Sequence, residues 1–304
     1  MNTTEAARRT EGGLGSPSSG RLTRLSAVGF WSLSLAVFWR PLANLASLSF
    51  HDERSSHILL IPLISACLLF IDRRKILRRA RRCLSLGLPL LLLAAILWFI
   101  LQTPLSRLAS ADRLSAVASL IYLVWIAGFL LFFGLGAFQE AIFPLLFLLL
   151  MIPIPVALAD GVVVLLQKGS AATCYALFRL LGVPVIRHGF QFSLPGVDIE
   201  VAQQCSGIHS ALALFIAGLL LQHFLLQGSW KTAFFIACIF PVAIFKNAVR
   251  IVTIAWLGIH VSPNFFHGQL HRQGGLPFGV LAVVMLGLIL WALRRLRFRG
   301  AEGI

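Results

Sequence analysis

The sequence has 304 residues, of which 58% are apolar and only 12% charged, and its mean hydropathy is +0.88. A water-soluble domain of this size would not hide so much apolar surface, and several apolar runs reach the roughly 18 residues needed to cross a bilayer. The net charge of +15 comes from basic residues clustered beside those runs. That placement is typical of membrane proteins and argues against nucleic-acid binding.

The chain begins with a stretch rich in Ser, Gly and Thr, and we expect residues 1–25 to form a disordered tail. The first apolar run starts late and has no small-residue cleavage site after it, so a cleavable signal peptide is not expected. The candidate spanning segments are 28–48, 58–72, 84–101, 114–136, 141–158, 205–226, 232–258 and 276–293. The sequence therefore predicts an all-α, polytopic transmembrane bundle of about eight spans, with a single membrane domain over 26–296.

A different kind of segment lies between 159 and 204. Residues 162–181 have a helical pattern but carry Lys168, Ser170 and Arg179. We expect this helix to lie in the membrane interface or to re-enter the membrane, within a short extracytoplasmic segment.

The basic residues orient the chain. Alternating the eight spans with the largest Arg blocks inside puts 16 of the 26 Lys and Arg residues in the cytoplasm and 7 outside. The remaining three, Arg40, Lys246 and Arg250, fall within spans. Both termini, including a tail at 297–304, are then cytoplasmic. The basic clusters are expected to attract anionic membrane lipids, at about 1 kcal/mol per surface cation.

One of the five cysteines stands apart. Cys205 has polar neighbours and a helix start beside it, and a helix N-terminus or a nearby cation lowers the pKa of a thiol. In the predicted orientation Cys205, Arg250 and the loop with His267 and His271 meet at the outer membrane face. An Arg within a span costs at least about 2.5 kcal/mol. It either snorkels to the headgroups or faces a partner, and the adjacent Lys246 and Asn247 make its helix face unusually polar.

Thiol, guanidinium and imidazole groups together suit acyl transfer through a thioester. The thiolate attacks a carbonyl, the imidazole accepts and returns the proton, and the guanidinium stabilises the oxyanion. No His, Cys, Asp or Glu set has the spacing of metal ligands, and neither a metal nor a cofactor is expected. We expect Gly207 to permit close helix packing.

Several motifs in a fixed order resemble the exosortase family, with the archaeosortases as more distant relatives. They are Ser56-His57 with Leu60 to Pro62, Pro144 to Pro155, Gly182 to Arg187, Ile199 to Ser210, Asn247 to Arg250 and His271 to Gly275. The resemblance covers about residues 57–291. It implies a cysteine transpeptidase of the bacterial inner membrane, with its active site facing the periplasm. Its partners would be secreted proteins that end in a Pro-Glu-Pro-like motif, one spanning helix and a basic tail.

The resemblance also implies site residues. The family's catalytic Cys, Arg and His match Cys205, Arg250 and His271, the last because His271 and Gly275 have the His-x-x-x-Gly spacing. His209 stands where the family commonly has Arg, so it competes with His271 as base. The other residues expected to support the site are Glu200, Lys246, Asn247 and His57.

Two other functions are considered beside this one. A non-catalytic membrane component of exopolysaccharide or protein export would use the polar cluster for packing or assembly. A transporter would grip an anion with Lys246 and Arg250, but the inverted repeats typical of such proteins are not detected. The sorting motif, the acceptor (an amine or water) and the oligomeric state leave no trace in the sequence.

Overall fold

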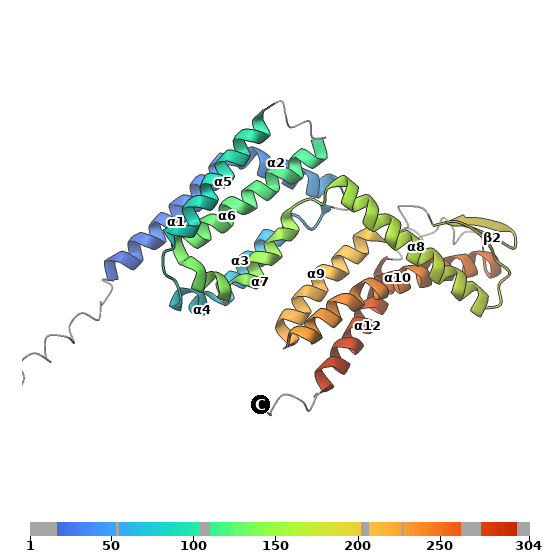
Figure 1. Cartoon of the computed structure of the whole chain (residues 1–304). Helices are drawn as coiled ribbons and strands as arrows, with labels where there is room; N and C mark the ends of the chain where they lie inside the picture. The colour runs from blue at the N-terminus through green and yellow to red at the C-terminus, as the bar shows by residue number, and fades with distance from the viewer. Residues whose placement is uncertain are drawn as a thin grey trace, which may run out of the picture. The chain divides into compact units, whose positions relative to one another are not determined.

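The computed structural model describes residues 17–52, 55–103, 110–201, 207–226, 228–262 and 275–296. It is mostly α-helical, and the chain divides after Pro155 into two compact units. Figure 1 shows the elements of both units in chain order.

The first unit consists of helices. They are α1 (Pro17–Val37), α2 (Trp39–His51), α3 (Leu60–Ile71), α4 (Arg73–Arg78), α5 (Leu84–Gln102), α6 (Ser110–Glu140), α7 (Ile142–Phe147) and the 3₁₀ helix η2 (Leu148–Met151). Helices α5 and α6 pack along each other (Figure 1). The segment expected at 28–48 is bent by 68° between α1 and α2. Pro41 accounts for the break, because its ring clashes with the carbonyl of Val37, where α1 ends.

The basic segment after α4 is fixed against α6 by its backbone. The Arg81 N–H donates to the Phe133 carbonyl at 2.9 Å. The next residue, Gly134, has φ +74°, and a Cβ there would lie 1.8 Å from the Arg81 carbonyl oxygen. Only glycine allows both the left-handed backbone and this approach. Arg79 and Glu140 form an ion pair of 3.0 Å nearby, which fixes the same segment to the end of α6.

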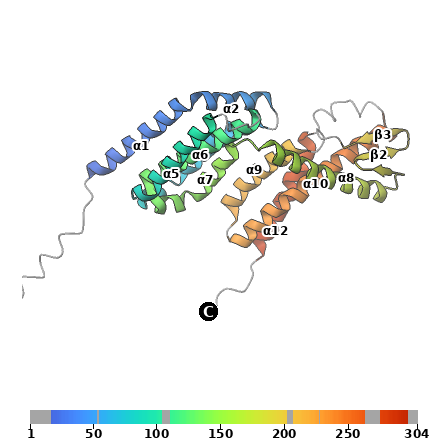
Figure 2. The same ribbon diagram turned by 45° about the horizontal axis from the view of Figure 1, so that its top comes forward.

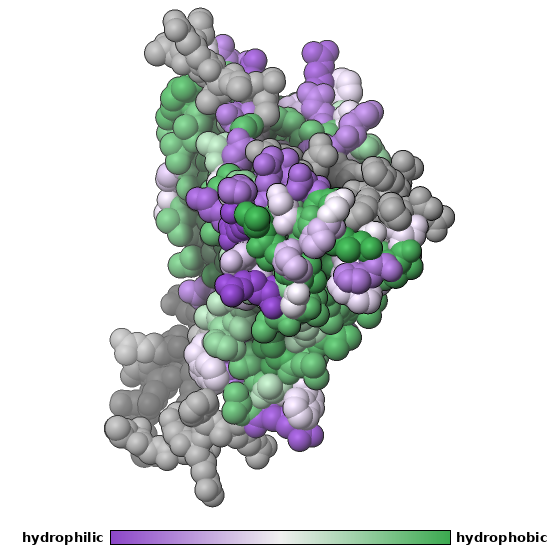
Figure 3. Space-filling view, turned by 90° about the vertical axis from the view of Figure 1, so that its right-hand side faces the viewer, coloured by the Kyte–Doolittle hydropathy of each residue, from purple (hydrophilic) through white to green (hydrophobic). Residues whose placement is uncertain are grey.

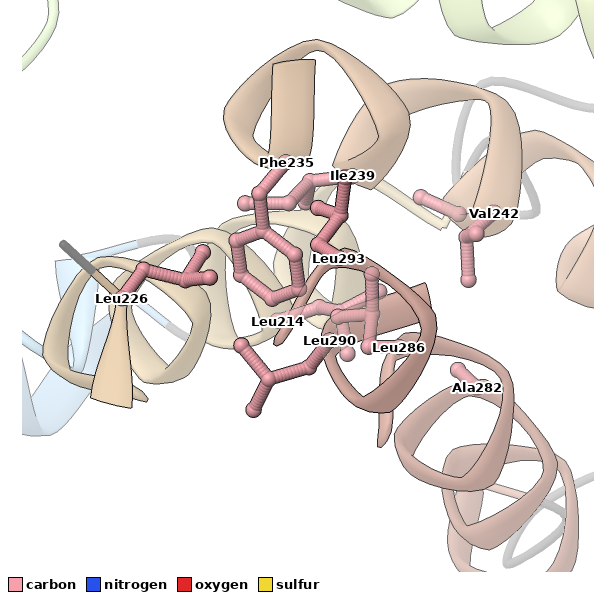
Figure 4. Close-up of a cluster of buried hydrophobic side chains, with 10 residues drawn as sticks. Leu214, Leu226, Phe235, Ile239, Val242, Ala282, Leu286, Leu290 and Leu293 are labelled. Carbon is pink, nitrogen blue, oxygen red and sulfur yellow. The ribbon is translucent and has the colours of Figure 1, made fainter. Parts of the chain in front are cut away.

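The second unit joins four long helices to a small sheet. The helices are α8 (Val156–Leu180), α9 (Ile208–Leu225), α10 (Ser229–His260) and α12 (Gly275–Arg295). Helices α9, α10 and α12 share an apolar core, with Leu214, Phe235 and Leu290 at its centre (Figure 4). A Cβ at Gly218 would lie 2.6 Å from Cδ1 of Ile239, so glycine lets α9 approach α10 closely.

A three-stranded antiparallel sheet follows α8, in the order β1 (Ile186–His188), β2 (Gln191–Leu194) and β3 (Val197–Glu200). Alternate residues of β2, Phe192 and Leu194, are buried. They pack on Phe178 of α8 and Val252 of α10. Figures 1 and 2 show the strands beside these helices, and Figure 3, which looks onto this side, shows hydrophilic residues interspersed with hydrophobic ones. The segment set apart between 159 and 204 thus contains most of α8, followed by a short β-meander over 186–200.

The prediction of an all-α polytopic membrane protein is confirmed, with fewer long spans than expected. Six described helices are long and apolar enough to cross a membrane, and the bent α1–α2 pair brings the number to seven. The segment 141–158 is not one helix. It divides into α7, η2 and an irregular stretch, since Pro153 and Pro155 interrupt it. The segment 58–72 contains only the 12 residues of α3. By length and composition α8 also qualifies as a span.

Candidate functional site

One turn of α10 carries the polar residues singled out from the sequence. Lys246 is 4% exposed and Asn247 1% exposed, whereas Arg250 is half-buried. Lys246 and Arg250 are four residues apart and therefore lie on the same face of the helix. The structure thus encloses two strongly polar side chains in an otherwise apolar helix.

Hydrogen bonds join this turn to the two neighbouring helices. The Lys246 ammonium donates to the Ser210 hydroxyl of α9. The Ser210 hydroxyl donates in turn to the Gly207 carbonyl at 2.9 Å. The Asn247 amide donates to the hydroxyl of Ser170 on α8 at 3.0 Å, and Ser170 is fully buried. These five residues, Ser170, Gly207, Ser210, Lys246 and Asn247, are called the polar junction below.

Gly207 is the N-cap of α9 and has φ +72°. A Cβ at this position would lie 3.1 Å from both Cγ and Oδ1 of Asn247. Glycine is therefore required twice, by the left-handed backbone and by the approach of α10. The expectation that Gly207 permits close helix packing agrees with this geometry.

We expect Gly207→Ala to destabilise the protein more than Gly182→Ala. Gly182 has nearly the same φ, +71°, but a Cβ there would meet nothing within 4 Å. Gly182→Ala should cost about 1 kcal/mol for the strained backbone, and Gly207→Ala at least about twice that, because Asn247 must also move. Unfolding of the purified protein by titration with denaturing detergent measures both values. Equal losses would show that Asn247 yields without cost.

Hydrogen bonds also hold Val201, the last described residue before Gly207 in the chain. Gln167 of α8 is buried and donates its side-chain amide to the Val201 carbonyl. The Val201 N–H donates to the Phe190 carbonyl at 3.0 Å. Residues 202–206 lie outside the described residues. They connect Val201 to Gly207, and both of these ends are fixed by side chains of the second unit.

Two Trp residues indicate where the polar junction lies along α10 relative to a membrane–water interface. Trp230 and Trp291 are about half exposed, with exposures of 46% and 54%. Lys231 lies over the Trp230 ring at 6.0 Å and Arg295 over the Trp291 ring at 4.3 Å. Such amphipathic pairs are typical of a membrane–water interface. Arg250 lies 20 residues beyond Trp230 in one helix, about 30 Å along its axis and thus one hydrocarbon thickness away.

The site residues predicted from the sequence fall into three groups: those on α10, two exposed residues on α9 and β3, and the remaining ones. Lys246, Asn247 and Arg250 lie together on α10, as expected. His209 is exposed in the first turn of α9, and Glu200 is exposed at the end of β3.

The remaining predicted residues are Cys205, His271 and His57. Cys205 and His271, with the neighbouring His267, lie outside the described residues. His57 belongs to the first unit, where it is half-buried in the turn before α3 and its carbonyl accepts the Leu60 N–H at 3.0 Å.

Three participants were not proposed as site residues from the sequence: Gln167, Ser170 and Ser210. Gln167 and Ser170 are three residues apart, so they lie on one face of α8. That spacing was the available signal. Ser210 lies one turn after Gly207 in the Cys205 motif, but its partner, Lys246, is far away in the sequence.

Among the residues that the structure describes, no three His, Cys, Asp or Glu side chains gather so as to hold a metal ion.

Comparison with known proteins gives one match. A family model described as transmembrane exosortase matches residues 30–293, a range that covers most of each unit and contains all the site residues discussed above. Neither a curated protein nor a solved structure matches the sequence.

Proposed function

Since this chain belongs to the transmembrane exosortase family, we propose that it is a membrane cysteine transpeptidase that processes the C-terminal sorting signal of secreted proteins. The observation that carries the proposal is the polar junction. Polar side chains of α8, α9 and α10, most of them buried, meet beside Gly207, which follows Cys205 by two residues in the sequence. Polar groups inside a membrane are costly, and a functional site is the usual reason for keeping them.

The proposed reaction has two steps. The Cys205 thiol gives its proton to His271, and the thiolate attacks a peptide carbonyl of the sorting motif. Arg250 stabilises the oxyanion, the C–N bond breaks, and the leaving amine takes the proton from His271. An amine acceptor or water then attacks the thioester and releases Cys205. Helix α9 begins at Ile208, three residues after Cys205 in the sequence, and its partial positive charge would favour the thiolate.

The chain topology supports an extracytoplasmic site. The positive-inside rule puts the ends of α10 and α12 that carry Lys231 and Arg295 in the cytoplasm. Arg250 and the start of α9 then lie toward the opposite face, which is the periplasmic side of a bacterial inner membrane. The C-terminus is cytoplasmic in this arrangement. The substrate's own spanning helix would be bound within the bilayer, with its motif at the periplasmic boundary.

A reporter tests the proposal. A secreted domain is fused to a Pro-Glu-Pro-like motif, a spanning helix and an Arg-rich tail, and it is produced with or without this chain. We expect a shorter product, lacking the helix and tail, only when the chain is present. A reporter with the motif replaced by alanines is the control and should stay intact. An uncleaved reporter in the presence of membrane-inserted chain would instead favour a non-catalytic role in export.

A further inference from the structure

Lys246 is an unexpected residue for its position. It lies 16 residues beyond Trp230 on α10, about 24 Å along the helix and hence within a hydrocarbon layer of roughly 30 Å. Its side chain is almost fully enclosed, and its ammonium donates to the Ser210 hydroxyl. The ion pairs between described residues, Lys75–Asp72 and Arg79–Glu140, do not involve Lys246. The cation is therefore satisfied by a neutral hydroxyl and not by a carboxylate of the described chain.

The hydrogen bonds from Lys246 lead directly to the start of α9. Lys246 donates to Ser210, and Ser210 donates to the Gly207 carbonyl. The same carbonyl accepts the Ala211 N–H at 2.8 Å, as the first backbone bond of the helix. Each donor in this series polarises the next, which strengthens the bonds. The ammonium is thus two hydrogen bonds away from a residue that follows Cys205 by two positions.

The next residue of α10, Asn247, also contacts the start of α9. Asn247 contacts Gly207 and donates to Ser170 of α8. At the opposite end of the segment 202–206, Gln167 of α8 donates to Val201. Buried polar side chains therefore hold both ends of a five-residue segment, and this segment carries the proposed nucleophile.

We propose that Lys246 is a positioning residue for Cys205 and that it acts through Ser210. The inference rests on the proposed function, because it takes Cys205 as the nucleophile. Lys246 fixes the carbonyl at which the nucleophile segment joins α9. It also provides a buried positive charge one turn from Arg250. In the proposed reaction, a negative charge that develops on the Cys205 sulfur or on the oxyanion would offset the cost of keeping two cations on one helix face.

The test compares variants by processing kinetics and by alkylation of Cys205 with iodoacetamide, measured by mass spectrometry in the purified full-length chain. Cys67, which is exposed on α3 in the first unit, is the internal reference for alkylation. Lys246→Met should lower kcat roughly 10- to 100-fold with KM nearly unchanged, the effect typical of a lost charged hydrogen bond. It should slow alkylation of Cys205, but not of Cys67, by about tenfold.

Four further variants separate a positioning role of Lys246 from a packing role. Lys246→Arg keeps the charge and should restore kcat to within about fivefold of the wild type. Ser210→Ala should lower kcat by itself, and the double variant with Lys246→Met should be no slower than Lys246→Met alone, because the two residues act in series. Lys231→Met, at the other end of α10, should leave both measurements unchanged.

Two outcomes would overturn the inference. In one, Lys246→Met and Ser210→Ala keep wild-type kcat and alkylation rates while Cys205→Ala is inactive; the proposed function then stands without this role for Lys246. In the other, Lys246→Arg fails to restore kcat although it unfolds at the wild-type detergent concentration, which would leave the residue a packing role only. Processing by Cys205→Ala would instead overturn the proposed function itself.

Discussion

A Cys205→Ala variant should accumulate in the membrane at the wild-type level and leave its substrate uncleaved. In the proposed reaction the sulfur forms the thioester, so its loss should lower the processing rate by roughly 10⁴-fold or more. Immunoblotting of the reporter, with the chain quantified in the same membranes, measures both quantities. Hydroxylamine should release a trapped acyl group from the wild-type chain and not from the variant.

The described cysteines provide matched controls. Cys238 lies half-buried on α10, the helix that also carries Arg250, and Cys67 is exposed on α3. Cys174 is fully buried, with its sulfur 3.7 Å from the Ala248 carbonyl oxygen, so it packs between α8 and α10. Cys238→Ala and Cys67→Ala should process the reporter normally. If Cys205→Ala also did so, thioester chemistry at this residue would be ruled out.

The long spans were predictable from the sequence because apolar composition alone decides them. The segments 84–101, 114–136, 232–258 and 276–293 correspond to α5, α6, α10 and α12, within a few residues at most ends. A run that is apolar on all sides has no stable alternative to a helix in the bilayer, where each backbone group must be satisfied internally.

The irregular parts were harder to predict, because backbone chemistry competes with composition there. The segment 141–158 is apolar enough to span, but prolines remove N–H donors and divide it into α7, η2 and a loop. The β-meander did have a local signal. Buried and exposed residues alternate in β2, and Gly189 and Gly196, both at positive φ, lie at the two turns. That signal was outweighed by the helical character of the rest of the chain.

Only the part of the candidate site that lies on one helix could be predicted from the sequence. Lys246, Asn247 and Arg250 are close in sequence, and helical spacing alone puts them on neighbouring positions of one surface. Ser170 and Ser210 are ordinary hydroxyls in apolar helices, and single sequences contain many of these. Their role depends on which helices meet, and the close approach of α9 and α10 at Gly207 determines that.

Arg250→Ala should lower the rate of thioester formation by roughly 10²- to 10³-fold, the usual effect of removing one oxyanion donor. Arg250 is half-buried and one turn from Lys246, and in the proposed topology it lies near the membrane boundary, where water competes less with its hydrogen bonds. Single-turnover capture of the acyl group by hydroxylamine isolates this step from product release. Arg179→Ala is the control, since Arg179 is exposed on α8 and lies over the Tyr175 ring at 5.9 Å.

An Arg250→Lys variant separates catalysis from simple anchoring of the helix. A lysine snorkels to the headgroups as well as an arginine does, so an anchor would tolerate the change. An oxyanion donor would not, because the planar fork of the guanidinium is lost and the compact ammonium is placed differently. We therefore expect Arg250→Lys to lose at least tenfold in thioester formation with unchanged membrane insertion. Full activity would mean that Arg250 only anchors α10 at the interface, and a loss of anion flux without a requirement for Cys205 would mean transport.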